Sequence, residues 1–317
     1  MKAIARIFPW MGCFLCMTTA LARAKQPAGA GDANRAGQPA TFTFTSFDPP
    51  GSVVTQAWAI NNEGAVVGDY ADSTGTYFGY KRLSNGSFTA PITVAGENVY
   101  TDGLNDFGLI AGYSSVGTGQ GYPPPNPVTT FTLSSGVYTD FTIGTDTQIN
   151  AINNNGDFAG IFEENSSRYP GFLHVAATGS TEEFSVAGSD FTFAYGLNRK
   201  DVVVGIYKAT AASAAFGAFI RNASGTILTF VFPGASSSGA TSINECGTIV
   251  GVFTDSAGAN HGFYGKLGGF TQIDYPQATW TIVTGMNDHG EIVGHYLDAS
   301  GVLHGFVATP PVPSCSP

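Results

Sequence analysis

Apolar and polar residues follow one pattern that occurs six times along the chain. In five copies an apolar residue precedes Asn and a Gly follows the Asn by three positions, whereas the copy at 197–201 has Asp in place of that Gly. The repeated asparagines are Asn61, Asn105, Asn153, Asn198, Asn244 and Asn287, which are 44, 48, 45, 46 and 43 positions apart. Self-similarity at such a period is typical of repeat architectures.

Each copy contains signals for four short strands and three tight turns. A β-rich run ending in Gly follows the Asn turn, as in VVGDY at 66–70, and in three copies an Asp-x-x-Gly turn comes next, beginning at Asp72, Asp255 and Asp298. A Gly-aromatic strand and a third turn complete the copy. Asn and Asp open such turns by bonding nearby amides, and Gly closes them because it accepts positive φ. Four antiparallel strands every 43–48 residues predict a β-propeller blade, whereas a repeated β-sandwich would need about twice the residues per unit.

The two ends of the repeat region complement each other. The last copy stops after its third strand, and the segment FTSFDPP at 44–50 matches FTQIDYP at 270–276 position by position. An N-terminal strand that completes the last blade would leave no open sheet edge. The sequence therefore predicts an all-β fold, a six-bladed β-propeller of four-stranded antiparallel blades over residues 41–309, with the last blade closed by the N-terminal strand.

The repeated units resemble a known family. INECGTIVGVFTDSAGANHGF at 243–263 and MNDHGEIVGHYLDASGVLHGF at 286–306 are similar to the HAF-type extracellular repeat of bacterial exported proteins. The resemblance covers nearly all of 41–309, and it is weakest in the second and fourth copies. It implies export and a propeller-like β fold, and it supplies no catalytic residues.

The N-terminus has the features of a cleaved secretory signal peptide at residues 1–24. Lys2 and Arg6 precede an apolar run, and an Ala-x-Ala site ends at Ala24. A retained membrane anchor is the alternative interpretation. Residues 25–40 are expected to be a flexible leader and residues 310–317 a C-terminal tail. The predicted location is outside the cytoplasm, either extracellular or periplasmic, with no membrane insertion once the signal is removed.

Export also bears on the cysteines, of which there are four. Cys13 and Cys16 lie in the signal segment, so that Cys246 and Cys315 remain. Two thiols in an oxidising compartment favour one disulfide between them, with a pair of free thiols as the alternative. No metal site and no cofactor are predicted, because isolated cysteines lack the close spacing of zinc ligands.

The composition and net charge of the chain limit the classes of partner that it is expected to bind. The formal net charge is −10, and removal of 1–24, which holds three basic residues and no acidic one, changes it to −13. A nucleic-acid partner is excluded because that interface needs a surplus of Lys and Arg to neutralise phosphates. Carbohydrate or protein ligands remain, and the chain is expected to be monomeric.

Candidate binding residues lie outside the repeated positions. The repeated Asn and Asp are interpreted as turn formers. A Pro-rich insertion, GYPPPNPV at 121–128, can present Tyr122 to a partner, or it is a tolerated surface loop. If Asp298–Gly301 is a four-residue turn, His295 faces His304 across a hairpin, where the pair could bind a ligand or a metal or simply line a groove.

No nucleophile elbow, HExxH motif or phosphate-binding loop occurs in the sequence. The preferred hypothesis is an exported propeller that acts as a binding or scaffold module for carbohydrate or protein. One alternative is an extracellular polysaccharide hydrolase or lyase with its site at the mouth of the propeller channel. A purely structural envelope protein is the other.

Overall fold

All regular secondary structure in the described residues is β. The computed structural model describes residues 42–117, 126–165, 167–210, 213 and 215–311. Within these ranges 23 strands are present, β1 to β23. No helix in this part of the chain is long and apolar enough to span a membrane. The predicted signal peptide, leader and most of the C-terminal tail lie outside the described residues.

Four sheets each contain four consecutive antiparallel strands. The first consists of β5 (Asn98–Leu104), β6 (Ile110–Ser115), β7 (Thr129–Ser134) and β8 (Val137–Asp140). The second consists of β9 (Thr145–Ile152), β10 (Phe158–Glu163), β11 (Gly171–Val175) and β12 (Ser180–Phe184). The third consists of β13 (Phe191–Leu197), β14 (Val203–Lys208), β15 (Gly217–Arg221) and β16 (Ile227–Phe230). The fourth consists of β17 (Ser237–Ile243), β18 (Ile249–Thr254), β19 (Asn260–Lys266) and β20 (Gly269–Ile273).

A seven-stranded sheet joins the first and last strands of the described chain. Its members are β1 (Thr43–Phe47), β2 (Val54–Ile60), β3 (Val66–Ala71), β4 (Tyr77–Arg82), β21 (Trp280–Met286), β22 (Ile292–Leu297) and β23 (Leu303–Thr309). Strand β1 pairs antiparallel with β23 from Thr43 opposite Thr309 to Phe47 opposite Gly305. One parallel pair, Val54 with Leu303, connects β2 to β23.

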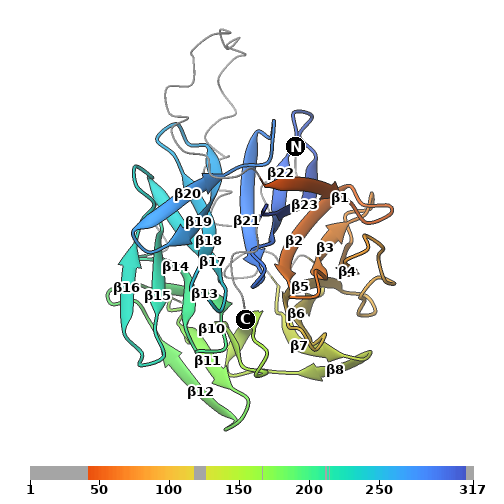
Figure 1. Cartoon of the computed structure of the whole chain (residues 1–317). Coiled ribbons are helices and arrows are strands. Elements are labelled where there is room, and N and C mark those ends of the chain that lie inside the picture. Colours follow the sequence, from red (N-terminus) through yellow and green to blue (C-terminus); the bar gives the residue numbers. More distant parts are fainter. Residues whose placement is uncertain (1–41, 118–125, 166, 211–212, 214, 312–317) are drawn as a thin grey trace, which may run out of the picture.

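The sheets lie side by side around a common centre (Figure 1), with strands such as β8, β12 and β16 toward the periphery. The chain thus forms six consecutive sets of strands, namely the four sheets, β2 to β4, and β21 to β23 with β1, and the first strand of each set is innermost. These inner strands are β2, β5, β9, β13, β17 and β21; each contacts the next, and β21 also contacts β2. The apolar core lies between neighbouring sheets, where side chains of one sheet pack against the next.

The repeated Gly and aromatic residues form cross-strand pairs. In the second and third strands of every set, a glycine stands directly opposite an aromatic residue: Gly68 and Tyr80, Gly112 and Phe131, Gly160 and Phe172, Gly205 and Phe219, Gly251 and Phe263, and Gly294 and Phe306. All six aromatic side chains are at most 2% exposed. A Cβ on any of these glycines would lie 1.9–2.2 Å from a backbone oxygen of the inner strand. The motif therefore needs Gly for close approach of backbone and ring.

Candidate functional site

A β-bulge interrupts every inner strand at the same place, three residues before the repeated Asn. The register shift leaves one extra residue in each strand. The bulge residues are Trp58, Asp102, Asn150, Tyr195, Thr241 and Thr284. Bulges re-aim a side chain, and they are frequent beside binding sites. Because the bulge positions carry five residue types, the repeated scaffold does not fix what they present.

Three bulge residues connect neighbouring inner strands. The Asn150 side-chain amide donates to the Ala194 carbonyl at 2.9 Å. The hydroxyl of Thr241 donates to the Val283 carbonyl at 3.0 Å. Thr284 donates in the same way to the Ala57 carbonyl at 2.8 Å. These side chains stabilise contacts between sheets.

The bulge residues Trp58, Asp102 and Tyr195 lie at or beside an aromatic cluster. All three are half-buried, and Trp58 and Tyr195 pack against the cluster. This cluster collects residues from the beginning of inner strands and from the strands paired with them, on the side opposite the repeated Asn. We call this side the aromatic end. Its buried members include Tyr77, Tyr100, Tyr113, Tyr169, Phe191 and Phe193.

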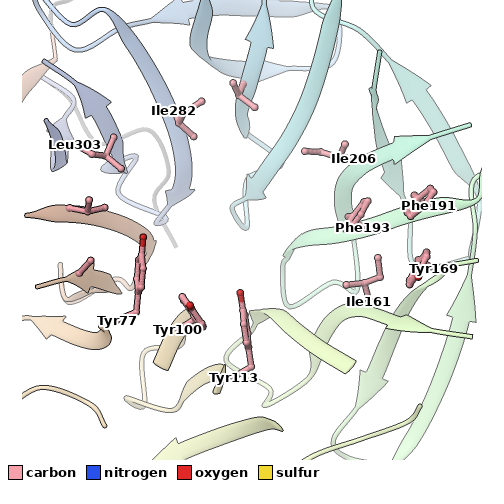
Figure 2. Packing of buried hydrophobic residues seen from close by; sticks show 13 residues of the cluster. Tyr77, Tyr100, Tyr113, Ile161, Tyr169, Phe191, Phe193, Ile206, Ile282 and Leu303 are labelled. Atoms are coloured by element: carbon pink, nitrogen blue, oxygen red, sulfur yellow. The ribbon is translucent and has the colours of Figure 1, made fainter. Parts of the chain in front are cut away.

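Aromatic rings at this end form two rows. Tyr77 and Tyr100 have ring centroids 5.4 Å apart, and Tyr100 stacks on Tyr113 at 4.9 Å. Figure 2 shows the hydroxyl groups of these three tyrosines pointing in a similar direction, toward the space that the sheets surround. The second row is Tyr169, Phe191, Phe193 and Tyr195, with neighbouring centroids 4.9–6.1 Å apart.

Two aspartates lie beside the first row. The indole Nε1 of Trp58 donates to Oδ1 of Asp69 at 2.6 Å, and Asp69 is 1% exposed. Burial, and secondarily the negative charge of Asp102, raises the pKa of Asp69 well above its usual range. Burial also raises the pKa of the half-buried Asp102, to about 7. Asp102 therefore titrates near neutral pH, which ordinary aspartates do not.

His295 lies at the same end. It is fully buried between the rings of Trp58 and Trp280, at centroid distances of 5.4 and 6.1 Å. Burial lowers the pKa of His295 to about 3, with a weaker opposing interaction from the backbone of Ala57. The imidazole is therefore neutral at physiological pH and serves as a packing residue behind the two indoles.

The opposite end, which we call the asparagine end, is formed by the repeated asparagines. Each side-chain Nδ2 donates to the backbone carbonyl of the next repeated Asn, and Asn287 donates to Asn61, at 3.0–3.5 Å. Each Oδ1 accepts from the amide four residues later, as a turn former does. All six are 3–5% exposed. The cycle of bonds ties every inner strand to its neighbours.

The residues that follow these asparagines form a second layer around a pocket of about 80 Å³. In five of the six steps, the backbone amide of one residue donates to the side chain of the next at 2.6–2.9 Å; the residues are Asn62, Asp106, Asn154, Arg199, Glu245 and Asp288. The sixth hydrogen bond, from the Asn154 amide to the Arg199 side chain, does not form, because a guanidinium group has no atom that can accept a hydrogen bond. Side chains at this end thus bond mainly to the protein itself.

The predicted histidine pair is wrong. His295 is opposite Gly305, and His304 is opposite Tyr296, so the two imidazoles do not face each other. The reason is the turn: the Asp298 amide donates to the Val302 carbonyl, and Gly301 has φ +82°. Leu297 therefore pairs with Leu303, so that five residues lie between these paired positions, one more than in the four-residue turn that the sequence suggested.

His304 instead lies between two carboxylates. Its Nδ1 is 2.7 Å from Asp48 Oδ2, and its Nε2 is 3.6 Å from Asp298 Oδ2. His261 has the matching position in the preceding sheet, with Asp274 at 3.0 Å and Asp255 at 3.4 Å. Two copies of one arrangement indicate that it belongs to the repeat. In the described part of the chain, no group of three or more His, Cys, Asp or Glu is placed to hold a metal ion.

The other predicted residues are only partly covered by the structure. Tyr122 and Cys315 lie outside the described residues. Cys246 lies in the turn after Asn244, and its amide donates to Asn244 Oδ1 at 3.1 Å. The disulfide and the role of Tyr122 stay predictions. Sequence reasoning missed Asp69, Asp102, Trp58 and Tyr195, because the bulges that place three of them follow from strand register and not from residue type.

Comparisons with known proteins support the fold. No family model matches the chain, and no curated protein matches it. Among solved structures, the lectin of Aleuria aurantia in complex with Fucα1-6GlcNAc has a TM-score of 0.51 at 12% identity, covering 85% of this chain and 99% of the lectin. TolB from Acinetobacter baumannii has a TM-score of 0.47 at 10% identity, covering 80% of this chain. The chain spans about half the length of TolB, 53%. The protein is thus all-β and propeller-like.

Proposed function

We propose that this protein is an exported, closed six-bladed β-propeller of the HAF-repeat type that binds carbohydrate through its aromatic end. Six copies of the repeat, six bulges and the cyclic order of contacts among the inner strands support the blade count. The pairing of β1 with β23 and the bond from Asn287 to Asn61 support closure. Cleavage after Ala24 and a Cys246–Cys315 disulfide belong to the same proposal.

One observation carries the assignment of the site. The bulge positions present an indole, a carboxyl and a phenol, at Trp58, Asp102 and Tyr195, at an end already rich in aromatic rings. Ligand sites combine mainly apolar and aromatic walls with a few polar groups that fix orientation. Sugars offer C–H faces that pack on aromatic rings and hydroxyls that bond to carboxyl and phenol groups. The same end has the residue types that carbohydrate recognition requires.

The experiment is a glycan-array measurement on the mature chain, with two variants. Trp280→Ala removes a half-buried indole at the aromatic end. Leu228→Ala is the matched control, because Leu228 is 59% exposed on β16. We expect at least a tenfold loss of glycan signal in Trp280→Ala and no change in the control. Absence of glycan binding by the unmodified chain would contradict the proposal.

A second candidate function is cleavage of polysaccharide, the alternative that the sequence left open. The observation in its favour is Asp102, whose pKa of about 7 suits a general acid or base at neutral pH. Against it stands Asp69, which at 1% exposure is poorly placed to act as a second carboxyl on substrate. Release of shorter saccharides from array-positive glycans, absent with Asp102→Asn, would favour the enzyme over the binding module.

A further inference from the structure

Asp69 and Asp102 are brought together across the boundary between two sheets. Asp69 lies on β3 and Asp102 is the bulge residue of β5. The residues that precede them in sequence, Gly68 and Thr101, are hydrogen-bonded to each other: the Thr101 hydroxyl donates to the Gly68 carbonyl at 2.6 Å. While Asp69 Oδ1 accepts from the Trp58 indole, its Oδ2 is buried and has no hydrogen-bond partner in the described residues. This is an unusual placement for a carboxyl group, since buried polar atoms are normally bonded.

Among the described residues, the groups shown to interact electrostatically with this acid pair are the two aspartates themselves and the tyrosines Tyr80, Tyr113 and Tyr195. Electrostatic interactions link Asp102 to Asp69, Tyr113 and Tyr195, and link Tyr113 also to Tyr100 and Asp69. Each of these groups becomes negative when it ionises. Neither aspartate forms an ion pair within the described residues. Burial makes ionisation of Asp102 costly, which is what its raised pKa reflects, and no ion pair in the described residues offsets that cost.

Aromatic rings surround the same place. Tyr100 and Tyr113 stack in one row, and the Trp58 indole is bonded to Asp69. Aromatic faces carry negative electrostatic potential and attract cations, above all quaternary ammonium groups and other amines. Carboxyl groups without a basic partner, set among rings, match the chemistry of a positively charged ligand that is large and weakly hydrated.

We propose that the aromatic end binds its ligand through a positively charged ammonium group, which is held by the Asp102 carboxylate and the neighbouring aromatic rings. This inference rests on the proposed function and names the ligand chemistry: an amino sugar within a glycan. A choline-type headgroup has the same ammonium chemistry, and the experiment below separates the two sources.

Proton release accompanies binding of such a ligand. A cation beside Asp102 favours the carboxylate, so binding lowers the pKa of Asp102 from about 7. The affinity for choline, whose charge does not titrate, is therefore expected to rise as pH increases from 6 to 8. A change of about fivefold to tenfold over this range corresponds to ionisation of one group near pH 7.

The test is isothermal titration of the mature chain at pH 7 with three probes: glucosamine oligomers, the same oligomers fully N-acetylated, and choline. We expect the glucosamine oligomer to bind at least tenfold more tightly than its N-acetylated form. Asp102→Asn, which keeps the shape and removes the charge, should abolish this difference. Asp140→Asn is the matched control, because Asp140 is exposed on β8 of the same sheet.

The outcomes separate the two proposals. Equal affinity for charged and N-acetylated oligomers overturns the ammonium inference and leaves carbohydrate binding intact. Tight choline binding without any glycan binding supports the ammonium site and overturns the carbohydrate assignment. Binding of none of the probes overturns the ammonium inference, and the glycan array then decides the proposed function alone. The comparison of oligomers on the unmodified chain needs no variant, so a folding defect in Asp102→Asn would not obscure it.

Discussion

At the asparagine end, six copies of one residue satisfy one another, whereas the six bulge positions carry five residue types, and three of the bulge residues lie at or beside the aromatic cluster. Each bulge lies on an inner strand, and the repeated Asn that follows it by three positions comes directly after the end of that strand. The asparagines use their donors and acceptors within the protein. At the bulges, Asp102 is left half-buried with a pKa of about 7. The comparison teaches that strict repetition marks the scaffold here, and that departure from the repeat marks the candidate site.

The largest expected effect concerns the glycine that stands opposite a buried aromatic residue in each cross-strand pair. In Gly251→Ala the new Cβ would lie 2.0 Å from the Gly239 carbonyl oxygen and 2.6–2.7 Å from the ring of Phe263. Backbone cannot move aside cheaply, so we expect a loss of more than about 4 kcal/mol or failure to fold. The control is Gly269→Ala, where a Cβ meets nothing within 4 Å. Chemical denaturation measures both, and equal stability of the two variants would refute the role given to the motif.

The next effect tests the asparagine end. Asn287→Ala removes the donor to the Asn61 carbonyl and the acceptor for the Glu291 amide, both buried or partly buried. The expected loss is about 2–4 kcal/mol in the free energy of unfolding, because buried partners are left unsatisfied. Asn155→Ala, at an exposed position of an equivalent turn, should cost less than about 0.5 kcal/mol. Glycan binding should be unchanged in both, and a binding defect in Asn287→Ala would break the division between the two ends.

A third prediction concerns how Asp102, at the aromatic end, makes the stability of the fold depend on pH. The raised pKa of Asp102 means that ionisation costs the folded state, so its contribution makes unfolding easier as pH rises from about 4 to about 7. Asp102→Asn removes this cost. We compare the free energy of unfolding of the variant with that of the unmodified chain at each pH. This difference should favour the variant by about 2–4 kcal/mol more at pH 8 than at pH 4. Denaturation curves at the two pH values measure it, and an effect that does not change with pH would show that Asp102 titrates normally.

The smallest expected effect is on stability at acidic pH, where His261 and His174 should contribute in opposite directions. Hydrogen bonding to Asp274 raises the pKa of His261, whereas burial lowers that of His174. His261 therefore stabilises the fold below pH 6.5, and this contribution is lost as pH rises through its folded pKa. His174 contributes to stability with the opposite pH dependence. The fold favours its neutral form, so stability falls as pH drops below 6.5. Each Gln substitution should alter stability at pH 5.5 by about 0.5–1 kcal/mol, in opposite directions. Changes of the same sign would contradict these assignments.

Much of the scaffold could be predicted from the sequence because the repeat encodes it locally. Turn residues such as Asn61 and Asp298 form the expected bonds. Even the departure at Asp201 is accommodated, since its φ of 55° is positive, as is the φ of Gly at this place in the other copies. The strand pairing of β1 with β23 could be predicted from the matching segments at 44–50 and 270–276.

The candidate site could not be predicted for two physical reasons. A bulge changes strand register by one residue without requiring any particular residue type. The amino-acid sequence therefore does not show that Asp102 is the extra residue. Turn length has a similar effect, and one residue moved His304 from opposite His295 to opposite Tyr296. Burial of Asp69 next to Trp58 depends on contacts between separate strands, β2 and β3. Such contacts are properties of the assembled sheets.

The pairing of β1 with β23 has a consequence for how the chain is made. Strand β1 is the first strand of the described chain to be synthesised, yet its partner is the last one. The hydrogen bond from the Tyr296 hydroxyl to Ser46 joins residues that are 250 positions apart. That sheet therefore cannot be completed until the chain has been synthesised through β23. A chain interrupted before β23 would leave β1 unpaired, so faulty products of early termination would expose an open strand to proteolysis.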